Sequence, residues 1–176
     1  MFPGFLFFLV FLGSLWSGMR RAEGGSGWLS TTAFGAGLMS VTINLGGAAT
    51  LVAARHKAGG LDPQLARLLK DLEEASFILT LLPLAVLLGA FAIVAIRASG
   101  GLPGWLGWIA AVISAAFLFG GLAESADLGG DWLLIPMLVG AYPFWVIATS
   151  VVLMRSSGES RPVERGSPTG GAAPAR

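Results

Sequence analysis

The side chains in this sequence best suited to bind a molecule are two polar residues inside apolar stretches. Asn44 is the only strongly polar residue deep within such a stretch, and Tyr142 is the only tyrosine of the chain. A polar group in that setting either lines a ligand or ion path or bonds to a neighbouring helix. For Asn44 we favour the interhelical bond, worth on the order of 1 kcal/mol. Tyr142 is a candidate for a polar cavity, because its hydroxyl needs a partner when buried.

Acidic residues form a second set of candidates, beside the ends of two apolar stretches. Glu73 precedes the stretch 75–96, and Glu124 and Asp127 follow the stretch 105–123. Carboxylates that converge can act as a general acid and base or hold a cation. Ionised carboxylates in exposed connections are the ordinary alternative, which we favour. The three acids therefore remain candidates for ligand binding, and no catalytic residue is predicted.

Several kinds of site lack the residues they need. The chain has no cysteine and a single histidine, His56, which excludes disulfides, thiolate ligands and a multi-histidine metal site within one chain. It contains no GxxxxGK[ST], GxSxG or HExxH motif. A net charge of +1 gives no indication of a nucleic-acid partner. We therefore predict no cofactor, no metal site and no nucleic-acid partner.

The elements that must position these candidates are long apolar segments. The chain is 55% hydrophobic and 12% charged, whereas average soluble chains are about 25% charged. Its mean hydropathy is +0.76. A helix needs about 20 apolar residues to cross a bilayer, and no alternating strand pattern is present. The sequence thus predicts an all-α, polytopic transmembrane helical bundle with five spans, at about 2–19, 28–54, 75–96, 105–123 and 132–154.

Two segments outside the spans have distinct compositions. PQLARLLKDLEE, residues 63–74, places its leucines at helical spacing, which predicts a short interfacial helix leading into the third span. An external docking surface or lid is the alternative for this segment. The tail, residues 156–176, is rich in Gly, Pro, Ser and Arg, which predicts disorder.

The distribution of basic residues predicts an orientation in the cell (inner) membrane. One set of connections carries Arg20, Arg21, Arg97 and Arg155 together with the arginines of the tail. The other set carries fewer basic residues and most of the acids. Because cytoplasmic loops are enriched in Lys and Arg, we expect the N-terminus outside and the C-terminal tail in the cytoplasm.

The second predicted span carries a stripe of small and polar residues. Ala33, Gly37, Ser40, Asn44 and Ala48 recur at steps of three or four, which places them on one face of a helix. Small residues allow two helix backbones to approach closely, and polar ones can bond across the contact. The stripe therefore predicts a helix-packing face.

The stretch GGLPGWLGW, residues 100–108, joins the third and fourth predicted spans. Its glycines and proline predict a tight turn rather than a ligand loop. Trp105 and Trp108 are three residues apart and therefore lie on one side of a helix at its start. Tryptophan is enriched at membrane interfaces, so we expect both residues to be interface anchors.

The chain resembles a group of small integral membrane proteins from actinobacteria, recorded as hypothetical or domain-of-unknown-function proteins. The resemblance rests on RRAEGGSGWLSTTAFGAG (20–37), GGLDPQLARLLKDL (59–72), PLAVLLGAFAIVAIRASGGLPGWLGW (83–108) and WVIATSVVLMR (145–155). It implies a six-span pattern of which this chain lacks the first span, and it offers no catalytic residue. At Gly104 the group commonly has a basic residue, so the departure weakens the orientation signal.

Three functions are consistent with these features. A structural or accessory membrane protein, packing against other membrane proteins or a second copy of itself in the bilayer, suits the small-residue stripe and is favoured. A transporter or channel for a small neutral solute is the alternative, with Asn44, Ser40, Thr42 and Tyr142 as path residues. Ion-coupled transport generally needs an ionisable group deep in a span, and none is present. A membrane-embedded enzyme using the acids has no motif to support it.

Overall fold

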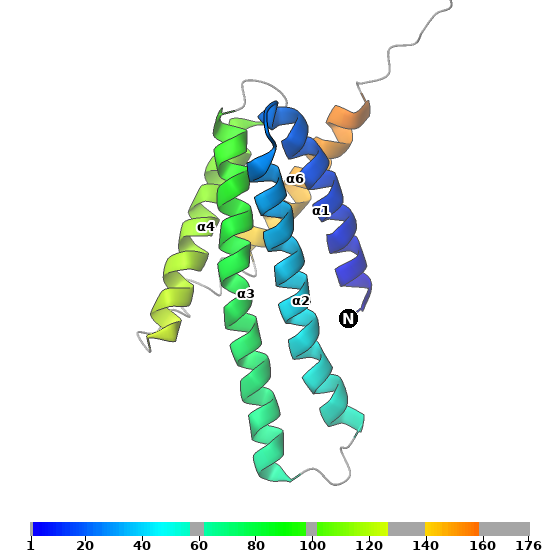
Figure 1. Ribbon diagram of the computed structural model, residues 1–176, viewed down its shortest axis with the longest axis vertical. Coiled ribbons are helices and arrows are strands. Elements are labelled where there is room, and N and C mark those ends of the chain that lie inside the picture. Colours follow the sequence, from blue (N-terminus) through cyan, green and yellow to red (C-terminus); the bar gives the residue numbers. More distant parts are fainter. Residues whose placement is uncertain (1, 57–61, 98–101, 127–139, 159–176) are drawn as a thin grey trace, which may run out of the picture.

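The computed structural model describes residues 2–56, 62–97, 102–126 and 140–158. This part of the chain is helical and contains no strand. The helices run up and down a single elongated bundle (Figure 1). In chain order they are α1 (Phe2–Glu23), α2 (Trp28–His56), α3 (Pro63–Arg97), α4 (Gly104–Ser125) and α6 (Tyr142–Gly158).

Four of these helices are long and apolar enough to cross a membrane, namely α1, α2, α3 and α4. They contain the first four predicted spans, with similar boundaries for α1, α2 and α4, whereas α3 begins 12 residues before the predicted start of the third span. The fifth predicted span corresponds in part to the shorter apolar helix α6, and its residues 132–139 lie outside the described residues. Of the predicted disordered tail, residues 156–158 end α6 and the remainder lies outside the described part.

The separate interfacial helix predicted over 63–74 is wrong, because these residues are the first turns of α3. The junction at Glu73, Glu74 and Ala75 contains no helix breaker, so the helix continues into the apolar segment. Within these turns Asp62 caps the start of α3 by accepting a hydrogen bond from the Gln64 amide at 3.3 Å. As a result, α2 and α3 form a hairpin that extends past the other helices (Figure 1).

The connection between α1 and α2 is tied down by side chains from the end of α1. The Glu23 carboxylate accepts hydrogen bonds from the amides of Leu29 and Ser30, at 3.1 and 3.0 Å, and so caps α2. Arg20 donates to the Ser26 carbonyl at 3.2 Å. Gly27 has a φ of 71°, which a residue with a side chain rarely adopts. The turn is therefore short and defined.

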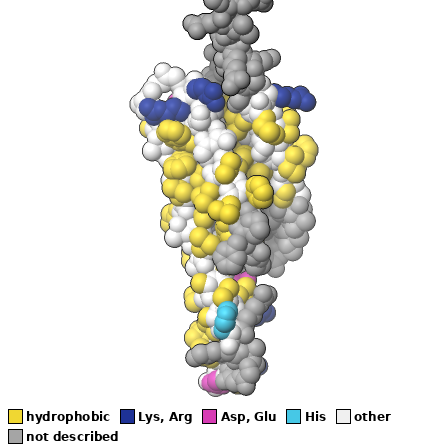
Figure 2. Space-filling view, turned by 90° about the vertical axis from the view of Figure 1, so that its right-hand side faces the viewer, with side chains coloured by type: hydrophobic (Ala, Val, Ile, Leu, Met, Phe, Trp, Pro, Cys, Tyr) yellow, Lys and Arg dark blue, Asp and Glu magenta, His cyan; other side chains and the backbone are white. Residues whose placement is uncertain are grey.

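The helices α1, α3 and α6 end at the same end of the bundle (Figure 1), and basic side chains are seen there in Figure 2. Arg20 and Arg21 lie in the last turn of α1, Arg97 in that of α3 and Arg155 in that of α6. The four described arginines that the sequence predicts on the cytoplasmic side therefore lie together at one end of the bundle. Trp105 and Trp108 lie in the first turns of α4 near this end, 51% and 65% exposed.

The flanks of the bundle are apolar on the outside (Figure 2). Large side chains such as Phe7, Leu79, Phe119 and Ile147 are more than half exposed. A soluble bundle rarely exposes so large a contiguous apolar surface to water. Lipid tails are as apolar as these side chains and can therefore surround them. The exposure pattern is what a helical bundle in a bilayer requires.

Trp145 is the centre of the buried core. Its ring lies 4.9 Å from that of Phe91 on α3 and 6.1 Å from that of Phe11 on α1, both in edge-to-face geometry. Its indole N–H donates to the Leu106 carbonyl of α4 at 3.3 Å. One α6 side chain therefore contacts three other helices and holds α6 against them.

Candidate functional site

A cavity of about 720 Å³ lies between α1, α2, α3 and α6, and we call it the Asn44 cavity. It brings together three of the residues predicted as ligand-binding candidates, Asn44, Tyr142 and Glu73. Most of the remaining wall is apolar, with Phe5 and Phe8 among its aromatic side chains. Ligand sites typically combine such apolar walls with a few polar groups, in volumes of roughly 300–1,000 Å³.

Asn44 connects α2 to α3 across the edge of this cavity. Its side-chain amide donates one hydrogen bond to the Thr80 hydroxyl and one to the Ser40 carbonyl, both at 3.0 Å. The Thr80 hydroxyl in turn donates to the Ser76 carbonyl at 2.9 Å. Both amide hydrogens of Asn44 are thus used, whereas its amide oxygen has no partner among the described residues. Asn44 therefore bonds two helices and retains one acceptor at the cavity wall.

Ser76 and Thr80 were missed by the sequence analysis. They lie one turn apart on α3 and line the cavity, and Thr80 is buried. Their i, i+4 spacing in an apolar segment is the signal that places them on one face. Thr42, a predicted path residue, is instead exposed and donates to the Leu38 carbonyl of its own helix at 3.0 Å.

Tyr142 reaches the cavity from the first turn of α6. Its ring lies 6.4 Å from the Trp145 ring in a nearly parallel orientation and 5.9 Å from the Phe117 ring. These contacts fix the ring, while its hydroxyl has no hydrogen-bond partner among the described residues. A hydroxyl in an apolar setting costs free energy unless it is paired. Tyr142 therefore offers the cavity a free donor and acceptor.

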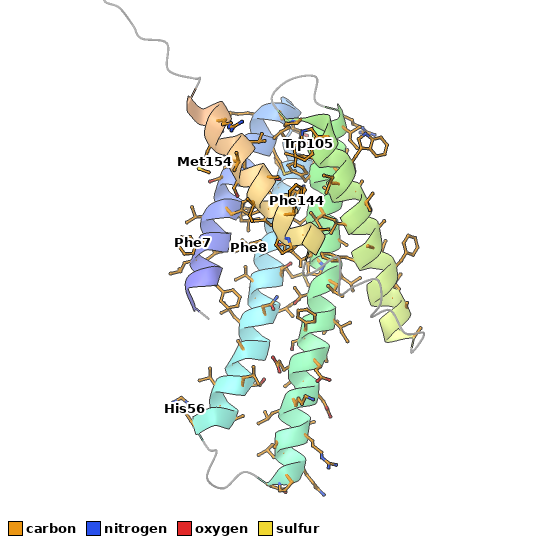
Figure 3. All side chains as sticks on the ribbon, turned by 180° about the vertical axis from the view of Figure 1, so that it is seen from behind. Phe7, Phe8, His56, Trp105, Phe144 and Met154 are labelled. Carbon is orange, nitrogen blue, oxygen red and sulfur yellow. The ribbon has the colours of Figure 1, made fainter. Side chains whose placement is uncertain are left out.

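Of the three acidic residues predicted as ligand-binding candidates, only the side chain of Glu73 is among those that the structure describes. Glu73 is half-buried and lines the Asn44 cavity. Glu124 belongs to the last turns of α4, but its side chain is not among the described ones. Asp127 lies outside the described residues. Within the described part of the chain, no group of three or more His, Asp or Glu side chains is arranged to hold a metal ion. The lone histidine, His56, is exposed at the end of α2 (Figure 3).

The predicted packing stripe of α2 lies on the face toward α1 and α3. Ala33, Gly37 and Ser40 are buried, and Asn44 and Ala48 are half-buried. A side chain at Gly37 would meet Leu12 of α1 and Leu87 of α3, the latter at 3.0 Å. One at Gly47, one residue before Ala48, would meet Ser76 at 3.0 Å. The stripe is thus occupied within the chain, and its lower part forms one wall of the cavity.

No family model, curated protein or solved structure matches the chain. The class of the protein therefore rests on its own architecture. The described residues form an all-helical bundle with four helices able to span a membrane and one shorter apolar helix. The resemblance to actinobacterial membrane proteins stays an expectation from the sequence.

Proposed function

We propose that this is an integral membrane protein that binds a small, mostly apolar, uncharged molecule in the Asn44 cavity. The observation that carries the proposal is the composition of the cavity wall. Asn44, Thr80 and Tyr142 place hydrogen-bonding groups on a surface that is otherwise largely aromatic and aliphatic. Such a wall favours a ligand with one or two polar atoms on an apolar body.

The charges around the cavity argue against an anionic ligand. Among the described residues of its lining, Glu73 is the only charged one and none is basic. An anion would find no partner there, and burying an unpaired charge is unfavourable. Binding a neutral molecule is the step expected of a neutral-solute transporter or channel, which is the alternative function that the sequence predicts. Coupled transport lacks support, because none of the described spans carries an ionisable residue at mid-depth.

Filling the cavity should abolish this binding. Ala48 lines the cavity, whereas the neighbouring Ala49 is exposed on another face of α2. We expect a neutral alkylphenol carrying a diazirine to crosslink to cavity residues of the wild type in lipid nanodiscs. Ala48→Phe should reduce that labelling at least about tenfold, because the new ring occupies the volume of the ligand. Peptide mapping by mass spectrometry measures the labelling at each residue.

Ala49→Phe is the matched control and should leave the labelling unchanged. Equal loss in the two variants would mean that a phenylalanine on α2 acts through the fold rather than the cavity. Labelling spread evenly over exposed residues such as Phe119 would indicate partition into lipid, and it would contradict the proposal.

The favoured expectation from the sequence, an accessory or interaction role, is supported by a different face of α2. Gly35 and Gly46 are exposed, and the space around the position of a side chain at each is open. Thr31, Thr42 and Ala49 share this side of the helix. A surface of small residues facing lipid is one that a second helix can approach closely. It is the second candidate function of the molecule.

Association through this face should be sensitive to bulk at its centre. We expect Gly35→Leu to weaken self-association or partner binding about tenfold, because the leucine holds the helices apart. Size-exclusion chromatography with light scattering in detergent measures the oligomeric state, and affinity purification from membranes measures stoichiometric partners. Wild-type protein that is monomeric and free of a stoichiometric partner would rule this candidate out.

A further inference from the structure

A second cavity of about 1130 Å³ runs between α1 and α6, and we call it the Arg21 groove. Its walls are mainly apolar over most of its length. Phe7 and Met154, labelled in Figure 3, lie on its α1 and α6 sides. The groove shares Gly4, Phe8, Tyr142 and Pro143 with the Asn44 cavity, and its other described lining residues are different.

Arg21, in the last turn of α1, carries the only charge among the described residues of the groove lining. It makes no ion pair with a described residue. Its Nε donates to the Ser17 carbonyl at 3.2 Å, which orients the guanidinium and leaves its terminal nitrogens with donors to spare. Arg155 follows Met154 at the same end of the molecule. The groove thus combines an apolar trough with a positive end.

The groove is somewhat longer than one lipid leaflet is thick. Residues Gly4 and Arg21 mark its two extremes on α1, and 17 residues of helix rise about 26 Å. Half of the hydrocarbon core plus one headgroup layer measures roughly 20 Å. A phospholipid with its phosphate at Arg21 therefore places its acyl chains along the apolar part of the trough.

We propose that the Arg21 groove binds one anionic phospholipid of the bilayer. The phosphate accepts charge-assisted hydrogen bonds from Arg21, and an acyl chain packs along Val10 and Ile147. An anionic headgroup is favoured over a zwitterionic one because none of the described lining residues is an acid that could pair with a headgroup cation. On the predicted topology this end faces the cytoplasm, where anionic lipids are concentrated. The proposal is independent of the ligand proposed for the Asn44 cavity.

The test measures how tightly an anionic and a zwitterionic phospholipid bind to the wild type and to variants of two neighbouring arginines. Delipidated protein in neutral detergent is titrated with phosphatidylglycerol or with phosphatidylcholine of the same chains, and native mass spectrometry counts bound lipid. We expect phosphatidylglycerol to bind about tenfold more tightly, and Arg21→Gln to remove that advantage. Arg20→Gln loses the same charge one residue away, outside the groove, and should retain the advantage.

A second pair of variants tests the trough itself. Ser150 lines the groove, whereas Val151 is exposed beside it. Ser150→Phe should displace phosphatidylglycerol, while Val151→Phe should not, and thermal melting checks that each variant is folded. Equal binding of the two lipids by the wild type, or equal loss in both arginine variants, would overturn the proposal. Ala48→Phe should leave this lipid bound, so failure here and failure of the Asn44 cavity are distinguishable.

Discussion

Replacing Trp145 with alanine should destabilise the bundle by about 3–5 kcal/mol, the usual range for emptying a buried aromatic site. The side chain is fully buried, and it contacts Phe11, Phe91 and the Leu106 carbonyl on three different helices. The alanine variant loses all of these contacts at once and leaves a void that α6 cannot close alone. For a chain of this size the melting temperature should fall by on the order of 10 °C. Far-UV circular dichroism of the protein in mild detergent measures it.

The adjacent residue provides the control for Trp145. Phe144 is also a large aromatic side chain on α6, but it is 57% exposed. Phe144→Ala should shift the melting temperature little, because lipid or detergent replaces the lost contacts. Trp145→Phe keeps an aromatic ring but removes the indole N–H donor. It should lower the free energy of unfolding by about 1 kcal/mol for the lost hydrogen bond, with a further loss from the smaller ring. Similar melting of the two alanine variants would contradict the position of Trp145 in the core.

Gly37→Leu is expected to have the second largest effect, a loss of about 1–3 kcal/mol or more from overpacking. A side chain at this position meets Leu12 on one side and Leu87 on the other. Both neighbours are themselves buried, so neither can move into free space. The leucine must therefore push α1 away from the α2–α3 pair. Thermal melting together with the elution profile on size-exclusion chromatography reports both the stability and the expansion.

Gly35 is the matched control for Gly37, two residues away on the same helix. The position of a side chain at Gly35 is surrounded by open space. Gly35→Leu should therefore change the melting temperature of the monomer by little, since surface substitutions usually contribute within about 0.5 kcal/mol. If both leucine variants melted alike, the packing of α1 and α3 against one face of α2 would be wrong.

The helices themselves were predictable because their signals are local. Long apolar segments bounded by Arg, Gly and Pro predicted α1, α2 and α4 with similar boundaries. The error at 63–74 arose because an amphipathic pattern and an apolar pattern follow each other without a breaker. Periodicity shows which face each segment presents, but it does not show that the two share one helix axis.

The candidate site was predictable only where a residue is rare. Asn44 and Tyr142 stood out by type, and the structure brings them to one cavity. Ser76 and Thr80 did not stand out, since serine and threonine are common in apolar helices and bond to their own backbone. Trp145 and Phe144 are adjacent aromatics in one apolar segment, and their opposite environments depend on how α6 packs against its neighbours.

The length of α3 limits how the molecule can sit in a bilayer. Its 35 residues extend about 52 Å, compared with about 30 Å of hydrocarbon. Containing the whole helix would need an inclination of about 55° from the normal, beyond the range of roughly 0–40° seen for membrane helices. At inclinations of 0–40°, roughly two to four turns of a helix of this length would extend into the headgroups or water. In a bilayer, the first turns of α3, which carry the Lys70–Glu74 ion pair, would therefore form a charged segment that projects beyond the hydrocarbon.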